Sequence, residues 1–175
     1  MAGARGDSEM DRKVWGLITQ LNSPDQKIRR EARLKLLGLD PASRPALVFT
    51  LRHGTENQRW QVAKALSQLQ DPATAPELVT ALKDESFGVR WLAAEGLIGM
   101  TCDGLVPLLE ALVESADSVW LTEGAHHVLH ELHDNGLERE ACAAAESVLT
   151  ALEGVELSVE VPWAAQAALE RLKKS

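Results

Sequence analysis

The stretch FGVRWLAAEGLIGM, residues 87–100, decides the fold, because its pattern of apolar and small positions recurs four more times along the chain. Counted from Val89, these positions fall at 0, +3, +4, +8 and +11, and at 100° per residue they form one continuous stripe. The stretch therefore predicts an amphipathic helix with a single buried face.

The same frame begins at Ile28, Gln58, Trp120 and Val161, so successive starts lie 30, 31, 31 and 41 residues apart. A second series of positions repeats with almost the same spacing. A further helix is expected before each frame, and each of these helices ends in a leucine, namely Leu21, Leu51, Leu82, Leu112 and Leu152. A period of this size is typical of stacked helical pairs, none of which can bury its apolar face alone. We expect five helical hairpins, with the ten extra residues of the last step lengthening the helices around residues 133–136.

Length and composition indicate one folded domain. The chain has 175 residues, of which 45% are hydrophobic, enough to bury a sizeable core. We expect a disordered tail over residues 1–11 and a single repeat domain over residues 12–175. Residues 1–13 have no apolar core of the kind that a signal peptide needs, and no apolar run approaches the length that spans a membrane. The two cysteines suit a reducing compartment, so we expect a cytoplasmic protein.

The charge is distributed unevenly along the chain. Residues 1–90 hold 14 Lys/Arg and 11 Asp/Glu, whereas residues 91–175 hold 4 and 15. In a linear stack, position in the sequence becomes position in space, so one end is expected to be acidic and to suit a basic or mixed-charge partner.

The sequence resembles HEAT repeats over roughly residues 12–172. The features that carry the resemblance are two helices per unit, a Pro near the start of the first, and a second helix reading Val-Arg-x-x-Ala-x-x-x-Leu at Val89, Arg90, Ala93 and Leu97. The short period is similar to bacterial HEAT-like units and to those of phycobilisome lyase subunits. The resemblance implies an all-α, right-handed α-solenoid of about five hairpins that binds a partner protein or peptide on its concave face.

The resemblance also implies a ladder of turn Asp and helix Arg side chains, here Asp25 with Arg29 and Asp84 with Arg90. The fourth and fifth units depart from the pattern at Leu121 and Pro162, and the ladder is expected to fail there.

A row of tryptophans is the main functional candidate. Trp60, Trp91 and Trp163 all fall at +2 of their frames, on the side turned away from the buried stripe. Tryptophan is a favoured anchor at interfaces, although the rings could instead cover the seams between repeats. Trp15 and Trp120 are expected in the core. We predict that a partner contacts the following residues: Trp60, Trp91, Trp163, Arg59, Arg90, Glu95 and His126.

A histidine cluster offers an alternative. His126, His130 and His133 can share one helical face with Glu123, a spacing that could bind zinc or another divalent metal. The same face could equally be a titrating surface patch.

Two further alternatives concern nucleic acid and catalysis. Basic residues are concentrated in the second helices of the first three hairpins. Phosphate binding needs a contiguous positive track, however, and the acidic half of the chain, residues 91–175, opposes it. The sequence has no Gly-rich phosphate loop, nucleophile elbow or paired carboxylates. We therefore expect a scaffold without enzymatic activity or cofactor, with a chromophore-lyase-like role as the alternative that the family resemblance allows.

Overall fold

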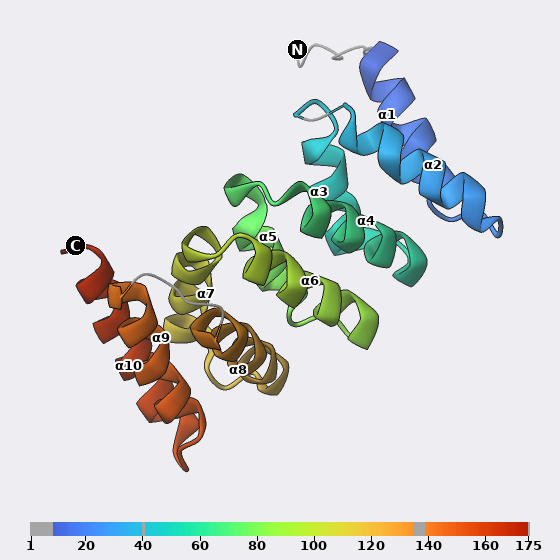
Figure 1. Ribbon diagram of the computed structural model, residues 1–175. Helices are drawn as coiled ribbons and strands as arrows, with labels where there is room; N and C mark the ends of the chain where they lie inside the picture. The colour runs from blue at the N-terminus through green and yellow to red at the C-terminus, as the bar shows by residue number, and fades with distance from the viewer. Residues whose placement is uncertain (1–8, 40, 135–138, 175) are drawn as a thin grey trace, which may run out of the picture. The chain divides into compact units, whose positions relative to one another are not determined.

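The computed structural model describes residues 9–39, 41–134 and 139–174, and within these ranges it contains helices and no strand. The all-α class predicted from the sequence is confirmed. The chain forms two compact units, Met1–Ala65 and Leu66–Ser175, each described here by itself. The elements are α1 (Glu9–Gln20), α2 (Gln26–Leu37), α3 (Arg44–His53), α4 (Glu56–Leu69), a 3₁₀ turn η1 (Pro72–Thr74), α5 (Ala75–Ala81), α6 (Phe87–Gly99), α7 (Cys102–Ser115), α8 (Val119–Asp134), α9 (Arg139–Leu152) and α10 (Leu157–Leu172) (Figure 1).

The helices follow the predicted alternation of first and second helices. Pro45 and Pro76 lie in the first turns of α3 and α5, where a missing N–H costs nothing. The helix α1 begins at Glu9, earlier than expected, and residues 1–8 of the predicted tail lie outside the described residues. The extra residues of the last step lengthen α8, which has 16 residues compared with 13 in α6, but α9 has 14 residues and is no longer than α7. Residues 135 and 136 of the predicted insertion lie outside the described residues.

The first unit is built on the contact of α1 with α2 and α3. Side chains at the start of α4 bind the end of α1, because Asn57 Nδ2 donates to the Leu21 carbonyl at 3.0 Å and Gln58 Nε2 to the Ile18 carbonyl at 3.2 Å. The polar Gln58 thus holds a stripe position by hydrogen bonding rather than by apolar burial. Ile28 is exposed, so the stripe of α2 is buried only from Ala32 onward.

Trp15 is not in the core, contrary to our prediction. The buried face of α1 is Val14, Leu17 and Ile18, and Trp15 lies 100° round the helix from Val14. Its exposed ring meets Phe49 of α3 edge-on, with 5.7 Å between centroids.

In the second unit, α5 packs against α7, and α6 packs against α8. First helices therefore contact first helices and second helices contact second helices. Gly96 allows α6 to approach closely, because a Cβ there would lie 2.7 Å from Leu78 Cδ1 and 3.1 Å from Ser67 Cα. This row of second helices positions the site described below.

The last pair reverses this order. The helix α9 packs against α8, and α10 packs against both α7 and α9 (Figure 1). The expectation that α10 continues the row of second helices is wrong, because α9 occupies that row and α10 lies beside the first helix α7. Only four residues separate α8 from α9, so α9 turns back along α8 as its antiparallel neighbour.

Trp120 is also not a core residue. Its frame is displaced by one position, and the buried face of α8 is Leu121, Ala125, Val128 and Leu132. One residue on a helix is a rotation of 100°, which turns Trp120 toward α6.

Candidate functional site

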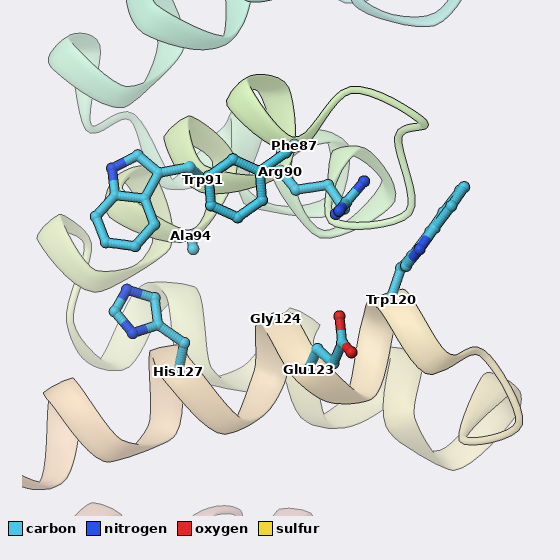
Figure 2. Close-up of a pocket in the computed structure, with 8 residues that line it drawn as sticks. All are labelled: Phe87, Arg90, Trp91, Ala94, Trp120, Glu123, Gly124 and His127. Atoms are coloured by element: carbon cyan, nitrogen blue, oxygen red, sulfur yellow. The ribbon is translucent and has the colours of Figure 1, made fainter.

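A groove lies between α6 and α8, with a volume of about 150 Å³ (Figure 2). We call it the α6–α8 groove. Its lining combines four aromatic side chains, two small residues and two charged groups, namely Phe87, Trp91, Trp120, His127, Ala94, Gly124, Arg90 and Glu123.

The α6 wall follows from helix periodicity. Phe87, Arg90, Trp91 and Ala94 recur at intervals of three and four residues and therefore share one face. The opposite face, which includes Val89, is buried and holds the helix against the rest of the unit. As a result Phe87 and Trp91 remain 67% and 47% exposed.

The α8 wall also follows from helix periodicity. Trp120, Glu123, Gly124 and His127 share a face that is rotated away from the buried stripe. A Cβ at Gly124 would lie 3.0 Å from Leu82 Cδ2, so glycine lets α8 lie close to the end of α5. With Ala94 opposite, the floor of the groove is made of small residues. Trp91 and Trp120 stand at opposite ends of this floor, and the ring of Phe87 lies between Trp91 and Arg90 (Figure 2).

At one end of the groove, the rings of Trp91 and His127 stack, with centroids 4.9 Å apart and an interplanar angle of 22°. His127 Nε2 is buried without a hydrogen-bond partner and lies 3.8 Å from Glu95 Oε1. That separation is too long for a hydrogen bond but short enough for charge attraction when the imidazole is protonated. The stack fixes the orientation of Trp91.

At the other end, Arg90 joins the two helices. Its Nη1 donates to the carbonyl of Asp84 at 2.8 Å and to that of Glu85 at 3.1 Å, both in the turn before α6. Its guanidinium carbon lies 4.9 Å from the ring centroid of Trp120 and 5.7 Å from that of Phe87. Both distances are within the range of cation–π attraction, so the charge of Arg90 is engaged within the protein.

The second charged group of the groove is free. Among the described residues, the carboxylate of Glu123 has no hydrogen-bond or ion-pair partner, and Figure 2 shows it rising from α8 between the two aromatic ends. The surrounding unit is acidic, since residues 66–175 hold 6 Lys/Arg and 19 Asp/Glu. The groove is therefore an aromatic surface with one uncompensated negative charge.

The predicted partner contacts are divided among several places. Trp91 and Arg90 line the groove, and Glu95 lies beside it through its contact with His127. His126 Nε2 faces Glu153 Oε1 at 3.8 Å. Trp163 is 78% exposed on α10, which is the helix beside α7, so Trp163 does not lie in the same helix row as Trp91.

Two predicted contacts belong to the first unit. Trp60 is half-buried on α4, with Lys64 Nζ 4.9 Å from its ring centroid. Arg59 Nη1 donates to the Gly54 carbonyl at 3.1 Å. Arg29 and Arg90 likewise bind carbonyls of the turn before their own helix, so these three arginines share a contact at the repeat period.

The histidines of α8 pair with carboxylates. His130 Nδ1 lies 3.4 Å from Asp134 Oδ2, and His133 Nδ1 lies 3.2 Å from Asp134 Oδ1. Over residues 9–39, 41–134 and 139–174, no group of three or more His, Cys, Asp or Glu side chains could hold a metal ion. The geometry gives the predicted metal ligands His126, His130 and His133 no support.

Four groove residues were missed as partner contacts by sequence reasoning: Phe87, Trp120, Glu123 and His127. The signal that could have identified them is the second face of α6 and α8, where large aromatic residues recur at helical spacing on the side opposite the buried stripe.

Comparison with known families agrees with the repeat pattern. A family model described as HEAT repeats matches twice, over residues 15–98 and 51–130, which together cover more than half of the chain. The matches end before α9 and α10, the pair whose packing order is reversed. No curated protein sequence matches the chain. Within the described residues, no helix has both the length and the apolar character needed to cross a membrane.

Proposed function

Because the chain belongs to the HEAT-repeat family, whose helical arrays are typical interaction scaffolds, we propose that it is a non-enzymatic scaffold or adaptor whose α6–α8 groove binds a partner protein. The observation that carries the proposal is the exposure of Phe87, Trp91 and Trp120 around one groove. Exposed apolar side chains that gather in one patch mark interaction sites, whereas singly scattered ones do not.

The groove has the features of an interaction hot spot. Trp91 is held by its stack on His127, and Trp120 by Arg90, so a partner does not have to order these side chains on binding. Tryptophan and arginine dominate the energetics of protein interfaces, and loss of a central anchor typically costs 2 kcal/mol or more. The groove therefore offers preformed apolar area at low entropic cost.

We further infer that Trp60, Arg59, His126 and Trp163 contact the partner outside the groove. They are exposed or half-exposed side chains of the types that interfaces favour. The setting we propose is the bacterial cytoplasm, from the short repeat period and the absence of a cysteine framework in the sequence.

Selection of peptides from a random displayed library tests the proposal. Peptides that bind the wild-type protein are titrated against Trp91→Ala and Trp120→Ala, with Trp15→Ala as the matched control, because Trp15 is 44% exposed, close to the 47% of Trp91 and the 42% of Trp120, but lies outside the groove. We expect the two groove variants to lose about 30-fold or more in affinity, which corresponds to about 2 kcal/mol. Helical circular dichroism should be unchanged. Binding that survives both groove substitutions would contradict the proposal.

A further inference from the structure

We propose that the partner segment which enters the α6–α8 groove is basic, and that a lysine or arginine side chain places its cation on Glu123 while its methylene groups lie between Trp91 and Trp120. This inference rests on the proposed function and names the chemistry of the partner. Four observations support it, two on charge and one each on aromatic surface and size.

The first observation is the imbalance of charge inside the groove. Arg90 uses its Nη1 on two carbonyls and directs its guanidinium at two rings. The carboxylate of Glu123 makes no hydrogen bond or ion pair within the described residues. An apolar side chain placed over the floor would cover a carboxylate and leave it without a partner, which is unfavourable, whereas a cation would satisfy it.

The second observation is the aromatic surface beside that carboxylate. The rings of Trp91 and Trp120 stand at opposite ends of the floor formed by Ala94 and Gly124 (Figure 2). Tryptophan attracts a cation placed over its face, and the long aliphatic stem of lysine or arginine packs well on apolar surface. Arg90 already makes such contacts with Trp120 and Phe87, so the groove itself contains an example of the chemistry it would apply to a partner.

The third observation is the field around the groove. With 6 Lys/Arg against 19 Asp/Glu, residues 66–175 attract positively charged segments from a distance. Glu95 is a further acidic side chain on α6, and its Oε1 lies 3.8 Å from Nε2 of His127. A segment with several basic residues would therefore associate faster than a neutral one.

The fourth observation is size. The groove volume, about 150 Å³, is below the range of about 300–1,000 Å³ typical of small-molecule sites. A single side chain of an extended or helical segment suits it better than a free organic ligand.

Three displayed peptide libraries test the inference. They have identical random flanks and differ only at the central position, which is Lys or Arg in the first library, Leu in the second and Glu in the third. The best peptides from each are titrated against the wild-type protein and Glu123→Gln. Glu110→Gln serves as the control, because Glu110 is an exposed carboxylate on α7 that does not line the groove. We expect the Lys/Arg library to give the strongest binders. Their affinity should fall about 10-fold in Glu123→Gln, remain unchanged in Glu110→Gln, and decrease with added salt.

Two other outcomes are distinguishable. If the best binders come from the Leu or Glu library and depend on Trp91 but not on Glu123, the inference about charge is wrong while the groove remains a binding site. If no binder from any library depends on Trp91 or Trp120, the proposed function fails together with the inference.

Discussion

The guanidinium carbon of Arg90 lies 4.9 Å from the ring centroid of Trp120, and this contact ties the helix α6 to the helix α8 of the next hairpin. The two residues are 30 positions apart in the sequence. The same arginine also closes the turn before α6 through the carbonyls of Asp84 and Glu85. Arg90 therefore shapes the groove and stabilises its hairpin at the same time.

Substitution Arg90→Ala should lower the free energy of unfolding by about 1–3 kcal/mol, since it removes two hydrogen bonds from a charged donor and the attraction to Trp120. Urea denaturation measures the loss. Arg171→Ala is the control, because Arg171 is an exposed arginine in the last turn of α10. Equal stability of the two variants would show that the contacts of Arg90 carry no net energy.

A buried polar pair in the first unit gives a second prediction. Arg33 is buried, and its Nη1 donates to Gln61 Oε1 at 2.6 Å. Gln61→Leu should cost about 2–3 kcal/mol, because it leaves a buried guanidinium without its acceptor, whereas Arg33→Met should cost less. Urea unfolding of both single variants and the double variant forms a cycle that isolates the pair. A coupling energy of zero would contradict the assignment.

The titration of Arg33 gives a third prediction. Burial, followed by the nearby positive charge of Arg30, lowers the pKa of Arg33 below that of an ordinary arginine. The unfolded chain therefore holds this proton more tightly than the folded one, so the contribution of Arg33 to stability rises with pH only in the strongly alkaline range where arginine loses its proton. Arginine stays charged at neutral pH, so between pH 6 and 8 the stabilities of wild type and Arg33→Met should differ by a constant amount. Parallel unfolding curves at these pH values check this, and a difference that varies with pH would contradict it.

Two glycines should respond in opposite ways to alanine. A Cβ at Gly104 would run into the carbonyl oxygen of Leu97 and lie 3.2 Å from its Cα, and backbone cannot yield as a side chain can. A Cβ at Gly16 on α1 would meet nothing within 4 Å. We expect Gly104→Ala to destabilise by about 1–3 kcal/mol and Gly16→Ala to stabilise by about 0.5–1 kcal/mol. Thermal unfolding followed by circular dichroism distinguishes the two signs.

The histidines of α8 allow a direct test of the metal alternative. Because His126 faces Glu153 while His130 and His133 face Asp134, we expect the purified protein to carry no stoichiometric zinc or iron. Elemental analysis of wild type and His130→Ala measures this. One equivalent of metal that disappears in the variant would instead establish the site.

Most of the fold could be predicted from the sequence, because helix periodicity and hairpin length are local properties. The stripe beginning at Val89 is buried at Ala93 and Leu97 as expected, and the leucines that end the first helices mark their boundaries closely. The groove could be predicted only in part. Trp91 and Arg90 were identified from their place in the repeat, but their partners on α8 depend on how that helix is rotated.

The sequence by itself determined that this protein is a series of amphipathic helical pairs, since a face repeated every 30 or 31 residues can be buried only against its neighbours. Only the tertiary structure decided that Leu121 rather than Trp120 faces the core of α8 and that α9 rather than α10 lies beside α8. A shift of the buried stripe by one residue rotates a helix by 100°. A short connection also allows either helix of the last pair to pack against α8. These choices are made by contacts between hairpins, which no single stretch of sequence contains.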